Sequence, residues 1–298
     1  MLLGLTSCCH ASEGAGITVY SLKFRPIVLW AAATCVVLAG CTGRPSATSL
    51  SSYQSMLIQE GRLRTETAPA DAPYTAEDLV RNFERIALRV EANSSVAGSD
   101  ANSKPTALQR WTGPLRYRID GTGATQADRN EVDDLMRRIA GLTGIDARES
   151  LDAPNFRILI TTPNERDAVA ADLARTSARS AMVFDAWRNN PRIVCISDRT
   201  YQASDANRIV GAIAVIGSET RGVLRTACLH EEIVQALGLA NDHPAVRPSI
   251  FNDDGEFALL TKHDEDLLRI LFDPRLETGM TAAEAMPIVR EIVRGLAP

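Results

Sequence analysis

Most side chains that could do chemistry fall in one stretch of the sequence, HEEIVQALGLAND. On a helix, Glu231 and Gln235 are four positions apart and share a face, so their side chains converge. Gly238 permits the left-handed turn that ends a helix and returns the chain with Asn241. Glu232 would then point toward an ion or water held between these groups. The spacing therefore predicts a site at the end of a helix.

The donor types limit what this site could hold. Carboxylates bind zinc, but the amide oxygens of Gln235 and Asn241 are poor zinc ligands and suit harder cations. We therefore expect no zinc cofactor. Two alternatives stay open: a calcium-like cation among these oxygens, or a buried polar network, with Asp242 included, that hydrogen-bonds the helix to its loop.

Three histidines form a rival set of metal donors: His230, His243 and His263. His230 precedes the first ligand position by one residue, which rotates it by about 100° around the helix. For each histidine the alternative is a surface or capping role.

The frame E-E-x-x-Q-x-x-G-x-x-N, starting at Glu231, resembles the zinc-binding motif of the metzincin metalloproteases, particularly the matrixin-like branch. A register starting at His230 would put Val234 in the second ligand place, and valine cannot bind a metal. The segment PSIFND matches the place of the group's Met-turn, with Phe251 in the methionine position. LTKHDEDLLRILFD resembles its closing helix, so the resemblance covers residues 111 to about 273.

The resemblance implies a degenerate active site. The three histidine ligands of that group are replaced by Glu231, Gln235 and Asn241. Glu232 keeps the place of the catalytic base, but without a metal-bound water it has nothing to activate. The whole chain also resembles a proteobacterial lipoprotein family with no assigned function.

The periodicity of apolar residues predicts the elements that must position the site. Strands are expected at 114–120, 155–162, 191–198 and 207–218. Helices are expected at 75–92, 124–144, 164–178, 220–239, 263–272 and 282–296. Thr75 and Asp78 have the spacing of a capping box at the start of the first helix. We therefore predict an α/β (α+β) fold, and the resemblance implies a mixed twisted sheet, a long site helix and C-terminal helices.

The N-terminal region indicates export. Lys23 and Arg25 precede the apolar residues 27–40, which are too few to span a bilayer comfortably and suit a signal peptide. The run ends in LAGC, which resembles a lipobox and predicts lipidation at Cys41. The alternative is an ordinary secretory signal with a chance cysteine. The distance of the basic residues from Met1 suggests a true start nearer Val19 or Ser21.

These patterns divide the chain into four expected parts. They are a signal peptide (1–40), a lipidated tether (41–73), an accessory helix and loop (74–104), and the degenerate metzincin-like domain (105–298). Beyond Cys41 the exported chain retains two cysteines, Cys195 and Cys228, which in an oxidising compartment predict one disulfide. The alternative is two buried thiols.

Bulk properties narrow the function. The net charge of −5 and the lack of a long basic run argue against a nucleic-acid binder. We expect a lipoprotein of a Gram-negative cell envelope, bound to the membrane by its lipid and facing the periplasm. Thr42 after the lipidated cysteine favours the outer membrane. The degenerate cleft would bind a peptide or protein. A metal-dependent hydrolase with unusual ligands and a purely structural lipoprotein are the alternatives.

Overall fold

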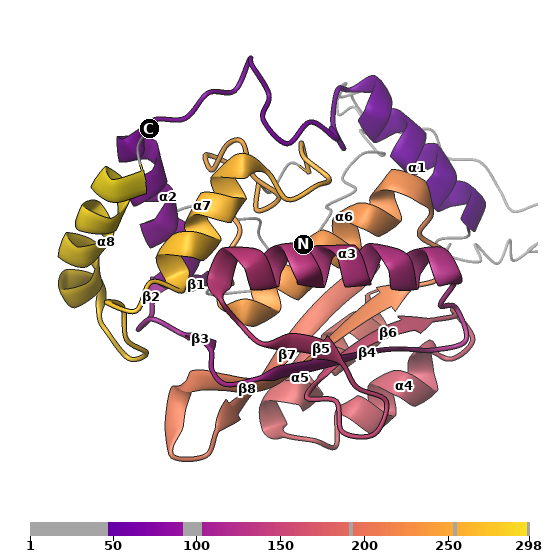
Figure 1. Ribbon diagram of the computed structural model, residues 1–298. Helices are drawn as coiled ribbons and strands as arrows, with labels where there is room; N and C mark the ends of the chain where they lie inside the picture. The colour runs from indigo at the N-terminus through magenta and orange to yellow at the C-terminus, as the bar shows by residue number, and fades with distance from the viewer. Residues whose placement is uncertain (1–46, 92–102, 191–192, 253–254, 297–298) are drawn as a thin grey trace, which may run out of the picture.

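The computed structural model describes residues 47–91, 103–190, 193–252 and 255–296 (Figure 1). The expected signal peptide and Cys41 lie outside these residues. Within them, no helix is both long and apolar enough to cross a membrane.

The core of the fold is one mixed sheet. Five strands run parallel in the order β3-β8-β6-β4-β5, and β7 joins β8 as an antiparallel hairpin partner. The strands of this sheet are β3 (Arg110–Trp111), β4 (Leu115–Asp120), β5 (Ala147–Glu149), β6 (Phe156–Thr161), β7 (Cys195–Gln202) and β8 (Asp205–Gly217). A separate antiparallel pair joins β1 (Arg89–Glu91) to β2 (Ser103–Pro105). The predicted α/β class with a mixed sheet is confirmed.

Helices cover both faces of the sheet (Figure 1). The helices are α1 (Ala47–Gln59), α2 (Ala76–Ala87), α3 (Gln126–Thr143), α4 (Arg166–Leu173), α5 (Ala178–Asn189), α6 (Gly222–Leu237), α7 (Lys262–Leu271) and α8 (Ala282–Leu296). In the view of Figure 1, α3 and α6 lie over one face and α4 and α5 lie under the other. Helix α5 was not predicted, although the Ser177 hydroxyl caps it by accepting the N–H of Ser180.

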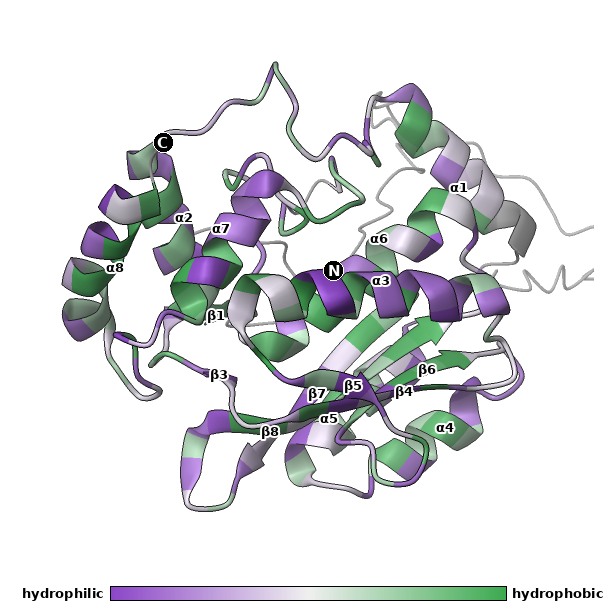
Figure 2. Cartoon of the chain, viewed as in Figure 1, coloured by the Kyte–Doolittle hydropathy of each residue, from purple (hydrophilic) through white to green (hydrophobic). Residues whose placement is uncertain are grey.

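Helix α6 crosses the middle of the molecule and is buried on nearly every side. Figure 2 shows apolar residues concentrated on the sheet and on α6, while the side of α3 turned to the viewer is hydrophilic. A helix buried all round needs apolar residues all round. Polar side chains that remain on α6 are therefore unusual and mark its candidate sites.

Helix α2 belongs to the same core as the sheet. Its side chains Leu79, Phe83 and Ile86 are at most 3 % exposed and join the central cluster. The predicted capping box of Thr75 and Asp78 starts the helix. The structure thus places this helix within the folded domain rather than ahead of it, because its apolar stripe packs against α7 and α8.

The segment expected to be a tether is also packed from α1 onward. Leu57 and Leu63 are buried beside α6. The backbone N–H of Leu63 donates to Gly255 O (3.0 Å), and Lys262 N–H donates to Thr67 O (2.7 Å). The apolar side chains of α1 were enough to dock a stretch whose composition suggested a flexible linker.

Candidate functional site

A disulfide fixes the helix of the predicted site against the sheet. Cys195 on β7 and Cys228 on α6 are bonded, with their Cα atoms 5.8 Å apart, which confirms the predicted pair. Ser197 lies two residues after Cys195 and shares its face of the strand. Glu232 lies four residues after Cys228 and shares its face of the helix. The bond therefore brings Ser197 and Glu232 together, and their side chains are hydrogen-bonded.

Glu232 is the most enclosed acidic group of this face of α6. Its residue is 1 % exposed, and its Oε1 atom has no hydrogen-bond partner among the described residues. Burial raises the pKa of Glu232, and the nearby carboxyl of Asp242 raises it further, while the bond with Ser197 lowers it. Burial also raises the pKa of Asp242, against a hydrogen bond from Gln235. Two carboxyls thus face one another in a dry environment, where holding both charges is costly.

The loop after α6 returns to the helix through Asp242. The Nε2 atom of Gln235 donates to Asp242 Oδ1 at 2.9 Å. The side chain of Asn241 instead donates to the carbonyl of Arg85 at 2.8 Å, at the C-terminal end of α2. We therefore find the helix-to-loop hydrogen bond one residue later than the predicted position. We name the set Ser197, Glu232, Gln235 and Asp242 the inner site.

Gly238 makes this return possible. Helix α6 ends at Leu237, and Gly238 follows with φ of 128°, a conformation that side-chain-bearing residues rarely adopt. A Cβ atom at this position would lie 2.3 Å from the carbonyl oxygen of Gln109. The glycine thus serves both the turn and the close approach of the chain that enters β3.

The turn around Phe251 supports the inner site from the loop side. Phe251 is fully buried, and its carbonyl accepts the N–H of His243 at 2.9 Å. The Ser249 hydroxyl and the N–H of Ile250 both donate to the buried carboxylate of Asp264 at the start of α7. This turn therefore ties the loop that carries Asp242 to α7.

The inner-site donors do not fit a zinc ion, which the resemblance to metzincins would imply. Glu231 is buried on α6, and the amide nitrogens of Gln235 and Asn241 donate hydrogen bonds, so these two positions offer only neutral amide oxygens, which are poor zinc ligands. Among the described residues, no group of three or more His, Cys, Asp or Glu side chains could hold a metal ion.

The three histidines lie in separate environments. His230 Nδ1 accepts the N–H of Leu260 at 2.9 Å. His243 Nδ1 accepts the N–H of Ala245 at 3.0 Å within its own loop. His263, on α7, is fully buried, and its Nε2 lies 3.1 Å from Asn82 Nδ2. The structure does not bring them together as the rival donor set.

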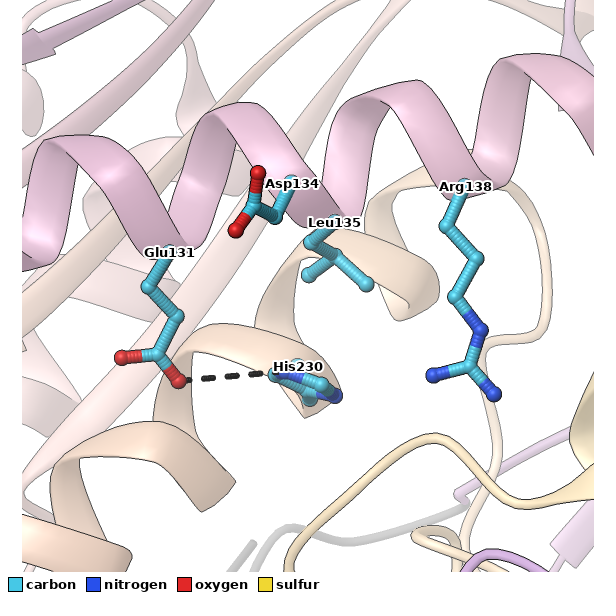
Figure 3. A pocket seen from close by; sticks show the side chains of 5 residues that line it. All are labelled: Glu131, Asp134, Leu135, Arg138 and His230. Carbon is cyan, nitrogen blue, oxygen red and sulfur yellow. Dashed lines mark ion pairs between the residues drawn. The ribbon is translucent and has the colours of Figure 1, made fainter.

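A pocket of about 360 Å³ lies on the opposite face of α6, against α3 (Figure 3). We name it the outer pocket; its lining residues are Glu131, Asp134, Leu135, Arg138 and His230. The Nε2 atom of His230 lies 3.8 Å from Glu131 Oε1. Because Nδ1 accepts from a backbone N–H, the neutral ring carries its proton on Nε2 and turns it toward Glu131.

The charges of the outer pocket are matched by neighbours. Arg138 donates to Glu265 at 2.8 Å and to the carbonyl of Leu260 at 2.9 Å. Burial lowers the pKa of His230 to about 4, with the charge of Arg138 acting in the same direction and Asp264 against it. Burial raises the pKa of Glu131, while a hydrogen bond with Thr226 lowers it.

Sequence reasoning missed two groups of residues. Ser197 could have been found from its spacing to Cys195 once the disulfide was predicted. The α3 residues that line the outer pocket have the i, i+3, i+4, i+7 spacing of one helix face. This spacing alone predicts that the face packs against another element, not that it lines a pocket. Nothing in the sequence indicates that this face meets His230.

The chain belongs to the family described as "Protein of unknown function (DUF2927)", whose profile matches residues 76–291. This match includes α2, in agreement with its place in the core. No curated protein and no solved structure matches the chain significantly.

Proposed function

We propose that this member of the family is a peptide-binding protein of the bacterial cell envelope, whose inner site is the degenerate cleft of a metzincin-like domain. The observation that carries the proposal is that an edge strand, β7, contributes a residue to the enclosed polar inner site. Strand β7 pairs with β8 alone among the strands described, and its residue Ser197 contacts Glu232. An extended peptide would add to such an edge through its backbone and place alternate side chains in the inner site.

Binding without hydrolysis follows from the chemistry of the donors. Amide side chains stand at two of the three ligand positions, and their neutral oxygens are poor zinc ligands. Without a metal-held water, Glu232 has no nucleophile to activate.

The second candidate is a metal-dependent hydrolase with unusual ligands. One observation favours it: Glu232 keeps the place of the catalytic base, and its Oε1 atom accepts no hydrogen bond from any described residue. Metal analysis of the purified chain, with peptidase assays of the wild type and Glu232→Gln, separates the two. Stoichiometric metal with cleavage lost in the variant would establish the hydrolase.

We also propose that a lipid on Cys41 holds the domain on the periplasmic side of the envelope, at the outer membrane. The basic residues, apolar run and LAGC of the leader support this. Mass spectrometry of the mature N-terminus tests it. An unmodified peptide running through Cys41 would contradict it.

Edge-strand binding is tested with extended eight-residue peptides and their versions with alternate N-methylated backbones. We expect methylation to weaken fluorescence-anisotropy binding to the full chain at least about tenfold, since several backbone hydrogen bonds are lost. A photo-cross-linker at Thr200, exposed on β7, should label the peptide. One at Leu151, 65 % exposed beyond β5, should not. Equal labelling at both positions would contradict the proposed surface.

A further inference from the structure

We propose that the inner site selects a primary ammonium group of the bound peptide, held by Glu232 with help from Gln235 and Asp242. This inference rests on the proposed peptide-binding function and names what that site would recognise. The group comes either from a lysine side chain or from a free N-terminal amine, and both present the same chemistry.

The first reason is that the inner site offers acceptors. Glu232 Oε1 is buried and has no hydrogen-bond partner in the part of the chain that the structure describes, which is an unusual state for a carboxyl oxygen. The Nε2 atom of Gln235 donates its hydrogen bond to Asp242, and the remaining Oε1 atom of the amide can only accept one. An ammonium group carries three N–H donors and no acceptor. The ligand atom that fits this surface is therefore a donor.

The second reason is charge. Glu232 is 1 % exposed, burial raises its pKa, and the neighbouring carboxyl of Asp242 raises it further. A buried carboxyl is stable when a cation or hydrogen-bond donor compensates it. A ligand that brings a positive charge would supply this compensation, whereas a carboxylate ligand would add to the repulsion.

The third reason concerns which cation fits. Calcium takes six to eight oxygen ligands, and the described residues contain no cluster of acidic, histidine and cysteine side chains suited to a metal ion. A guanidinium is planar and presents five donors in a wide fork, which needs more acceptors than one free carboxyl oxygen and one amide oxygen. An ammonium is compact, and a lysine stem of four carbons lets it reach a group below the strand edge.

The test uses four matched peptides of one sequence and the full chain. They have a lysine or an acetyl-lysine at the central position, each with a free or an acetylated N-terminus. We expect at least one amine to strengthen binding about tenfold or more over the fully acetylated peptide, because hydrogen bonds to charged groups are the strong ones. The arm that loses binding on acetylation identifies the source of the ammonium.

Variants localise the effect. Glu232→Gln should weaken the amine-bearing peptide about tenfold more than it weakens the fully acetylated peptide, because only the former loses a bond to a charged group. Glu131→Gln is the matched control, because it alters a partly buried glutamate on α3 that lines the outer pocket and not the inner site. Thermal unfolding of both variants checks that they fold, and the acetylation series needs no variant at all.

The outcomes separate the two proposals. If all four peptides bind equally, the ammonium inference is overturned and the peptide-binding function stands. If no peptide binds, n-butylamine alone decides: its binding to the wild type but not to Glu232→Gln supports an ammonium site and overturns the peptide function. If neither binds, both are overturned. Displacement of the amine-bearing peptide by calcium at millimolar concentration would point to a metal site instead and overturn the ammonium inference.

Discussion

The two faces of helix α6 place acidic groups in opposite circumstances. In the outer pocket, Glu131 lies beside His230, and Arg138 lies at the far end of the same lining (Figure 3). In the inner site, Glu232 meets a hydroxyl and a second carboxyl, that of Asp242. The outer pocket thus contains one cation of its own, Arg138, whereas the four residues that define the inner site, Ser197, Glu232, Gln235 and Asp242, include none. Helix α6 therefore borders one pocket that already contains a cation and one site that suits a cation supplied by a ligand.

The largest expected effect comes from breaking the support of the outer face. Arg225 on α6 and Asp128 on α3 form a buried ion pair of 3.0 Å. Replacing Arg225 by methionine leaves the aspartate uncompensated, and we expect a loss of about 3–5 kcal/mol in the free energy of unfolding. Urea denaturation measures this. A loss below about 1 kcal/mol would show that the two helices do not depend on the pair.

Breaking the support of the inner face should cost slightly less. The disulfide between Cys195 and Cys228 spans 33 residues. Replacing both cysteines by serine should lower the free energy of unfolding by about 3–4 kcal/mol, from loop entropy. Peptide binding should weaken as well, since Ser197 and Glu232 lose their alignment. Unchanged binding in the folded double variant would separate the disulfide from the site.

The faces should also respond to pH in opposite directions. The folded-state pKa of His230, about 4, lies below its ordinary value of 6.5. The stability contributed by the neutral ring is full above pH 6.5 and lost as the pH falls toward 4, by about 3 kcal/mol. The difference between the wild type and His230→Gln in urea denaturation from pH 7 to 4 measures this. A pH-independent difference would mean that the buried ring is not held neutral.

The smallest effect is expected at Glu232, with the opposite sign. Its folded-state pKa is raised above the ordinary 4.5, so stability is greatest when the acid is protonated and falls as the pH rises through the folded pKa. For a carboxyl with a raised pKa, this fall amounts to about 1.4 kcal/mol for every pH unit between the unfolded and folded pKa. Glu232→Gln should remove this pH dependence and stabilise the unliganded chain at neutral pH. Destabilisation at pH 7 would indicate that Glu232 already has a compensating partner.

Local sequence patterns predicted the helix ends and the disulfide. The end of α6 at Gly238 follows from the need for a positive φ, and the start of α2 follows from the capping box of Thr75 and Asp78. The disulfide was predicted by counting the cysteines of a chain expected to be exported. These features depend on neighbours in sequence or on compartment, so they can be read without a structure.

The remainder depended on distant partners. Asn241 donates to the carbonyl of Arg85, 156 residues earlier, and that carbonyl is available because α2 ends there. No spacing rule within the motif could predict this competitor, and so the contact with Gln235 came from Asp242 instead. The outer pocket also needs α3 to lie on α6, which is a property of the packed layers.

The docking of α1 has a consequence for where ligands can be met. Only five residues, 42–46, separate Cys41 from Ala47 at the start of α1. Fully extended, they reach at most about 20 Å. With a lipid on Cys41 as proposed, the short connection would hold the domain close to the bilayer surface. The domain would then meet ligands only in the layer of periplasm next to the membrane. Its ligands would be molecules that are themselves membrane-bound or diffuse along the membrane.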